Sequence, residues 1–344
     1  MLDLDGSDAG GQFVRSALAL SVLEGTPVRL RNIRGDRPTP GLRPQHAAVL
    51  EVLSSVADAS VSGLDVGSET VEFEPSEVDD WTSGGTYSVD VGTAGSTTLL
   101  FDALLPLATQ LDGTLSVRAT GGTDVKWAPP ADYYARIKLS TVRRFGLGVG
   151  FEVHRRGFYP DGGGEATLHL WPSDLERIDH TTRGEIRGVD LYSTQSRSLA
   201  DADVATRQLD GALETLRESR ALGDAFEATT LVATTAASDS PGSAIVIRLE
   251  HATGYAGVSA LGERGKPAET VGREAATDLL DLLATPSPVD VHLADQLLVF
   301  LALAGGRLRL PAITDHVTTS LDQLESFGYE GRVDAAGAGG VVTF

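Results

Sequence analysis

The sequence of 344 residues contains no cysteine. This absence excludes a disulfide scaffold, a cysteine-ligated zinc site, an iron–sulfur cluster and a thiol nucleophile. No run of about 18 apolar residues occurs, so the sequence predicts no transmembrane helix. The first ten residues, MLDLDGSDAG, are acidic and poor in apolar side chains. We therefore expect no secretory signal, and we expect a cytoplasmic protein that does not contact membranes.

Lysine is also scarce. Only Lys126, Lys138 and Lys266 occur, and the other 25 of the 28 basic residues are arginine. With 48 acidic residues, the formal net charge is -20. A surface rich in aspartate and nearly free of lysine is typical of a halophilic protein, and an ordinary acidic protein is the alternative. Such a charge would repel nucleic acid, although dense salt screens the repulsion.

One pattern of strand, helix, strand and loop occurs three times along the chain. The first strand of each copy is predicted in LDLDGS (2–7), YSVDVGTAGS (87–96) and VDVHLADQ (289–296). An apolar run with helical spacing follows each strand, ends in glycine, and leads to a second alternating strand. The complete unit is predicted to be strand–helix–strand–helix–strand–strand. Ordinary α/β alternation is the alternative to a true repeat.

The spacing of the three copies indicates an insertion. The first two start about 86 residues apart, and the second and third start about 200 apart. The surplus between about 180 and 280 has its own alternating strands and a long helical pattern at 202–221. We therefore predict an α/β fold whose large domain, 1–180 and 281–344, contains three β-α-β-α-β-β units. A small inserted α/β domain would occupy 181–280.

The loop after the second strand of the first unit reverses the local charge. Arg34, Arg37 and Arg43 lie in it with Asp36 as the one acidic residue, and Arg15 lies on the preceding predicted helix. Three prolines stiffen the loop and restrict the arginines. Arginine binds phosphate through two parallel hydrogen bonds, so this loop predicts anion binding. Solvated surface arginines are the alternative.

Two glycine-rich turns open predicted helices. Gly6–Gln12 precedes the first helix, and Gly92–Ser96 precedes the first helix of the second unit. Backbone N–H groups at a helix N-terminus suit phosphate groups, although glycine also permits tight turns without any ligand. Asp8, in the first turn, could ligate a divalent metal or cap the helix.

Seven histidines occur, and none has a metal-binding spacing such as HExxH. His316 differs from the others in its place, because it follows a predicted strand of the third unit in the sequence TDHVTT. A lone histidine more often has a structural role than a chemical one. Position alone therefore leaves both roles open for His316.

The sequence resembles the RNA 3′-terminal phosphate cyclases over positions 2 to 320. The matching stretches are LDGSDAGGQFVRSALALS, NIRGDRPTPGLRPQH, VGTAGSTTLL, GGTDVKWAPPADYYARI, RRGFYPDGGGE, HLADQLLVFLALAGG and TDHVTTS. The resemblance implies three repeated units and a small inserted domain, in agreement with the repeats described above. It also implies a reaction in which a histidine takes AMP from ATP and passes it to an RNA 3′-phosphate. The neighbouring 2′-hydroxyl then forms a 2′,3′-cyclic phosphate and releases AMP.

The resemblance places this nucleophilic histidine at His316. It implies ATP and a divalent metal, Mg or Mn, as the required small molecules, and RNA with a 3′-phosphate end as the substrate. Asp8 is the implied metal ligand. The expected nucleotide contacts are Pro129, His292, Asp295, Gln296, Arg15 and Gln45, and the expected RNA contacts are Arg34, Arg37 and Arg43.

The sequence departs from the family pattern at two of these positions. The family usually has a glutamate as metal ligand in a longer turn, where this chain has Asp8. It usually has a tyrosine that stacks on adenine, where this chain has His292. One alternative is a non-catalytic RNA-binding or ribosome-assembly factor of the same superfamily, which would lack the histidine. The other is a small-molecule transferase, such as an enolpyruvyl transferase, which normally has two domains of three units each.

Overall fold

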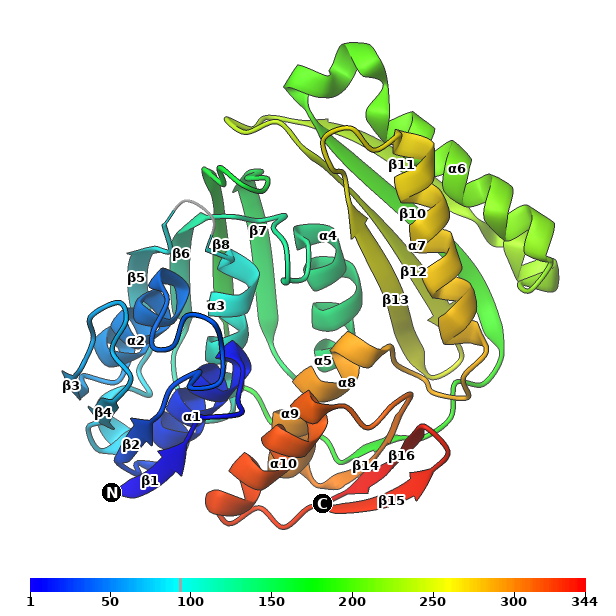
Figure 1. Cartoon of the computed structure of the whole chain (residues 1–344). Helices are drawn as coiled ribbons and strands as arrows, with labels where there is room; N and C mark the ends of the chain where they lie inside the picture. The colour runs from blue at the N-terminus through cyan, green and yellow to red at the C-terminus, as the bar shows by residue number, and fades with distance from the viewer. Residues whose placement is uncertain (93–94) are drawn as a thin grey trace.

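The computed structural model of the chain describes residues 1–92 and 95–344. Four sheets of four strands, together with their helices, make up the fold (Figure 1). Three of these sheets belong to repeated units, and the fourth belongs to the inserted segment. No helix in the described ranges is long and apolar enough to cross a membrane.

The first two units follow one another along the chain. The first contains β1 (Leu2–Asp5), α1 (Gly11–Glu24), β2 (Val28–Arg31), α2 (Pro44–Val56), β3 (Ser60–Ser62) and β4 (Val71–Glu74). The second contains β5 (Gly85–Asp90), α3 (Thr97–Leu104), β6 (Leu115–Gly121), α4 (Ala131–Tyr133), α5 (Leu139–Arg144), β7 (Val149–Arg155) and β8 (Gly164–Leu170). A π-helical stretch, Tyr134–Lys138, joins α4 to α5.

The third unit is divided by the inserted segment. It contains β9 (Ile178–His180), α8 (Val291–Gln296), α9 (Leu298–Ala304), β14 (Gly306–Leu310), α10 (Asp315–Ser326), β15 (Arg332–Ala336) and β16 (Gly339–Thr343). The inserted segment contains β10 (Ile186–Ser196), α6 (Val204–Ser219), β11 (Thr230–Ala236), β12 (Ser243–His251), β13 (Gly254–Leu261) and α7 (Ala268–Leu283).

The three repeated sheets have the same strand order, which confirms the repeat. The orders are β1-β2-β4-β3, β5-β6-β8-β7 and β9-β14-β16-β15. In each sheet the first two strands are parallel and the other pairs are antiparallel. A parallel pair needs a crossover, and the first helix of each unit provides it.

The prediction that residues 289–296 contain the first strand of the third unit is wrong. Residues 291–296 form α8, and the strand that pairs parallel with β14 is β9, more than 100 residues earlier. The insertion therefore interrupts the third unit between its first strand and its first helix. A strand of three residues has too little periodicity to be recognised in a sequence.

Two apolar cores support the fold. Alternation along β6 buries Leu115, Val117 and Ala119, because successive strand side chains point to opposite faces of the sheet. One continuous core joins the three repeated units, and a second lies between the inserted sheet and helices α6 and α7. The division of the chain into domains at 181 and 280 stays a prediction.

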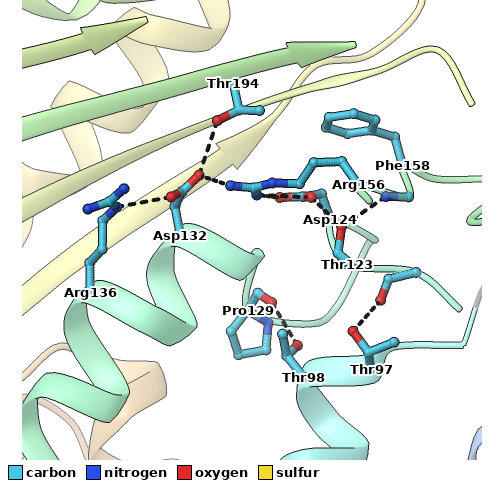
Figure 2. A network of polar contacts seen from close by, with 12 residues as sticks. Thr97, Thr98, Thr123, Asp124, Pro129, Asp132, Arg136, Arg156, Phe158 and Thr194 are labelled. Atoms are coloured by element: carbon cyan, nitrogen blue, oxygen red, sulfur yellow. Dashed lines mark hydrogen bonds and ion pairs between the residues drawn. The ribbon is translucent and has the colours of Figure 1, made fainter. Parts of the chain in front are cut away.

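A buried polar network holds the inserted sheet against the second unit (Figure 2). The Arg156 guanidinium lies between two carboxylates, 2.9 Å from Asp124 and 2.5 Å from Asp132. Asp132 also accepts a hydrogen bond from the Thr194 hydroxyl of β10, 3.1 Å away. The Arg156 backbone N–H donates to the Ala237 carbonyl at 3.1 Å. One arginine therefore connects loops of both parts of the protein.

Candidate active site

The N-termini of α1, α2, α3 and α10 lie next to one another. A methyl group on Gly10, the residue before α1, would lie 3.3 Å from Cε1 of His316 in α10. A methyl group on Gly11 would overlap His46 of α2. The Ser96 backbone N–H, before α3, donates to the Gln45 side chain at 3.4 Å. Four positive helix ends therefore surround one region, which favours a bound anion.

Four arginines add to this positive region. Within the described residues, no carboxylate forms an ion pair with Arg15, Arg34, Arg37 or Arg43. Burial, and then the positive charges of Arg43 and Arg37, lower the pKa of Arg34. Arginines that repel one another and form no ion pair favour an anion from outside the chain.

His316 lies in the first turn of α10 and is exposed. Partial burial, and then the charges of Arg37 and Arg15, lower its pKa below the ordinary 6.5. His292 also lowers this pKa, so the two predicted histidines lie in the same region. The His316 imidazole is neutral near pH 7 and has a lone pair available for nucleophilic attack.

His46 orients the start of α2. Its Nδ1 atom accepts a hydrogen bond from the Arg43 backbone N–H at 3.1 Å. Burial, and then the charge of Arg15, lower the pKa of His46 to about 3. A neutral ring whose Nδ1 accepts must carry its proton on Nε2, which faces Gly11. His46 therefore caps the start of α2 and lies close against the start of α1.

A polar recess of about 30 Å³ lies beside these helices, with Arg15, Asp102, Asp295 and Gln296 in its wall. Lys138 is fully buried behind it, forms an ion pair with Asp102 and donates to Oε1 of Gln296 at 2.9 Å. Burial raises the pKa of Asp295 to about 7, while Lys138 opposes the shift. Asp295 Oδ1 has no hydrogen-bond partner among the described residues.

Asp8 is exposed in the turn before α1. A hydrogen bond with Asp36, and then the negative charge of that residue, raise the pKa of Asp8. Two carboxylates held together in this way suit a cation. Across the described ranges, no three histidine, aspartate or glutamate side chains gather as a metal site. A metal here would therefore take its other ligands from substrate phosphates and water.

Pro129 and the second glycine-rich turn lie at the start of α3. The Pro129 carbonyl accepts a hydrogen bond from the Thr98 hydroxyl at 2.8 Å (Figure 2). Residues 93 and 94 of the turn predicted as a phosphate cradle lie outside the described residues. Ser96 caps α3 through its side chain, which accepts from the Leu99 N–H at 3.2 Å.

A family model described as RNA 3′-terminal phosphate cyclase matches residues 7–330. The chain belongs to the RNA 3′-terminal phosphate cyclase family. The protein of that name from Halobacterium salinarum is 44% identical to it, over 98% of both chains. Those from Pyrococcus furiosus and Archaeoglobus fulgidus are 41% and 43% identical, over 95% and 89% of this chain and 93% and 89% of their own.

Sequence reasoning missed several residues around this cyclase-family site. Lys138 and Asp102 had no signal, because each lies within an apolar helical pattern. Arg156 had none either, since an arginine at a strand end is ordinarily solvated. The glycine-rich turn did single out Gly10 and Gly11. Because glycine has no side chain, another group can approach such a turn closely, as His316 and His46 do here.

Proposed function

We propose that this protein is an ATP-dependent RNA 3′-phosphate cyclase in which His316 carries AMP. The main support is the position of an exposed, neutral histidine at a helix N-terminus, against Gly10 and beside Arg37. Arg37 and Arg15 lie close enough to lower its pKa, and Arg34 lies near Arg37 and Arg43. These four arginines form no ion pair with the described carboxylates and suit a triphosphate and an RNA phosphate. Membership of the family agrees with this assignment.

The proposed reaction has three steps. A ring nitrogen of His316 attacks the α-phosphorus of ATP, a phosphorus–nitrogen bond forms, and pyrophosphate leaves. An oxygen of the RNA 3′-phosphate then attacks the same phosphorus, which frees His316 and leaves AMP on the RNA end. The 2′-hydroxyl oxygen attacks the 3′-phosphorus, AMP leaves, and the hydroxyl proton passes to solvent.

The residues divide between the two substrates by location. Asp295 and Gln296 face the polar recess, and Pro129 borders the start of α3, so we assign these three to the nucleotide. His292 lies near His316, where its ring can stack on a base. Arg15 and Gln45 lie between these elements and would bind ATP phosphates. We assign the RNA phosphate to Arg34, Arg37 and Arg43.

A cyclisation assay tests this function. The full chain, ATP, magnesium and a short RNA with a 3′-phosphate are incubated in concentrated KCl. We expect the RNA end to become resistant to phosphatase, and a matched RNA with a 3′-hydroxyl to remain unchanged. RNA binding without any cyclic product would instead support the non-catalytic alternative.

Lys138→Met is expected to weaken ATP binding. Lys138 holds Oε1 of Gln296, so that only the amide N–H groups of Gln296 remain free to meet the nucleotide. Losing this orientation should raise the KM for ATP in protein labelling by about tenfold. The control is Lys266→Met, because Lys266 pairs with Glu274 on the surface. Equal KM values for the two variants would contradict the role of Lys138.

Asp8→Asn is expected to weaken the metal dependence of labelling. The family implies a divalent cation, which would offset the charge of the leaving pyrophosphate. Half-maximal labelling should require about tenfold more magnesium or manganese in the variant. Asp3→Asn is the matched control, because that carboxylate pairs with Arg31 at 2.6 Å. An unchanged metal requirement of Asp8→Asn would remove Asp8 as a ligand.

A further inference from the structure

Trp127 is the most exposed large apolar side chain of the described residues, with 88% of its surface accessible. It lies between β6 and α4 and belongs to neither apolar core. Its backbone φ is 62°, a conformation that bulky residues rarely adopt. Neither packing nor backbone preference therefore accounts for a tryptophan at this position.

A second aromatic ring lies beside it. Tyr159, between β7 and β8, meets Trp127 edge-to-face, with ring centroids 6.3 Å apart at an angle of 79°. The Nζ atom of Lys126 lies 5.4 Å from the Tyr159 ring centroid. The Tyr159 N–H donates to the Asp124 carbonyl at 3.1 Å, which ties the two loops together. Lys126 also pairs with Glu263 at 3.2 Å. The two rings and Lys126 form an exposed surface, which we name the Trp127 platform.

Hydrogen bonds and an ion pair hold the two loops that carry the platform. The N–H groups of Thr123 and Asp124 donate to the Gly157 carbonyl at 2.9 and 3.0 Å. The Asp124 side chain is held by Arg156 (Figure 2). Both loops are therefore fixed at their bases, so a ligand on the rings would lose little binding free energy to the ordering of the loops.

The platform adjoins the proposed active site. Trp127 precedes Pro129 by two residues, and Pro129 accepts a hydrogen bond from Thr98 in the first turn of α3. The residue that caps this turn, Ser96, donates to Gln45 of the arginine-rich segment. The start of α3 thus connects the platform on one side with the arginines on the other.

We propose that the Trp127 platform stacks an unpaired base of the RNA substrate near its 3′-phosphate end. This inference rests on the proposed function, which supplies the RNA. Aromatic rings accept any base, as an enzyme that recognises an end rather than a sequence requires. A protein partner would need an interface of about 800 Å² on each side, whereas two rings offer little more than the area of one base.

The charge of the protein strengthens this assignment. At a net charge of -20, the protein as a whole repels RNA at long range. Phosphate contacts by the arginines weaken as salt rises, because salt reduces the gain from released counterions. Base stacking involves no net charge. The platform therefore supplies the part of RNA binding that concentrated salt does not weaken.

Steady-state cyclisation of a single-stranded RNA with a 3′-phosphate tests the platform. Trp127→Ala should raise the KM for RNA about ten- to hundredfold, with a much smaller change in kcat, and Trp127→Phe should recover most of the loss. The loss should be equal at low and high KCl. A loss that disappears in high KCl would overturn stacking in favour of an electrostatic contact.

The matched control is Trp171→Ala, since Trp171 is also exposed and its ring stacks on His169. Its KM for RNA should equal that of the wild type. An abasic nucleotide at one position near the RNA end should raise the wild-type KM and add nothing to Trp127→Ala. Equal KM values for Trp127→Ala and Trp171→Ala, in a wild type that cyclises RNA, would overturn the platform alone. A wild type that forms no cyclic end would overturn the proposed function and the platform with it.

Discussion

Replacing His316 by alanine is expected to abolish the transfer of label from α-labelled ATP to the protein. The expected loss is on the order of a thousandfold or more, because alanine has no ring nitrogen to attack the α-phosphorus. The label on the wild type should be lost in acid and kept in alkali, as a phosphoramidate requires. The measurement is the protein-bound label after denaturing electrophoresis.

His154→Ala is the control for this result, because His154 is exposed on β7 and bonds to Thr167 at 2.8 Å. It should be labelled like the wild type. Equal label on His316→Ala and His154→Ala would place the nucleophile elsewhere. An RNA that already carries AMP on its 3′-phosphate should still be cyclised by His316→Ala, because that last step does not use the histidine.

The pH dependence of the labelling rate tests independently whether His316 is the nucleophile. Its pKa is lowered from 6.5, so the imidazole stays neutral and the rate stays high somewhat below that pH. Removing the positive charge of Arg37 by Arg37→Gln should raise this pKa. The acid limb of the rate profile should then move to higher pH, besides any loss in maximal rate. An unmoved acid limb would mean that another group controls the rate.

Arg156→Met is expected to cost about 3–5 kcal/mol of folding free energy. The change leaves Asp124 and Asp132, which are 1% and 8% exposed, without the guanidinium that lies between them. Asp132 keeps Arg136 at 3.0 Å, but Asp124 is left with no ion-pair partner among the described residues, which is strongly unfavourable for a buried carboxylate. Urea unfolding in concentrated KCl measures the loss.

The control for Arg156→Met is Arg332→Met, because Arg332 pairs with Asp334 on the surface, where its side chain is 80% exposed. That exposed pair should contribute less than about 1 kcal/mol. A loss of similar size in both variants would show that the buried network does not stabilise the protein.

The stability difference between the wild type and Arg156→Met should shrink in acid. Burial alone would raise the pKa of Asp132, but Arg156 and Arg136 overcome this effect and hold it below 3.8. A lowered carboxylate pKa stabilises the folded state above the unfolded pKa, and this stability is lost as pH falls through the folded value. The difference should therefore persist at pH 7 and decline below about pH 4.

The repeated units were predictable because their signals are local. Alternation in the strands, helical spacing in the apolar runs and a glycine such as Gly25, which ends α1 at φ 58°, all lie within short windows of sequence. The first strand of the third unit was missed for the opposite reason. β9 is three residues long and is defined by its pairing with β14 across the whole insertion.

The residues of the candidate site also differ in whether a local sequence signal indicates them. The sequence singled out His316 and the arginines of the first loop, and their roles in the reaction stay predictions. It gave no signal for Lys138, whose partner Gln296 lies 158 positions along the chain. Nor could it show that Asp295 has a pKa of about 7, since that value depends on burial produced by several helices.

The sequence by itself determined the repeated α/β units and the family, because periodicity and motif order are properties of consecutive residues. Only the tertiary structure decided which charges have partners. Among the described residues, it left Arg37 and Arg15 without ion pairs near His316, buried Lys138 behind the recess, and enclosed Arg156 between two carboxylates. The physical reason is that protonation, ion pairing and exposure depend on neighbours in space, and the fold draws these neighbours from distant parts of the chain.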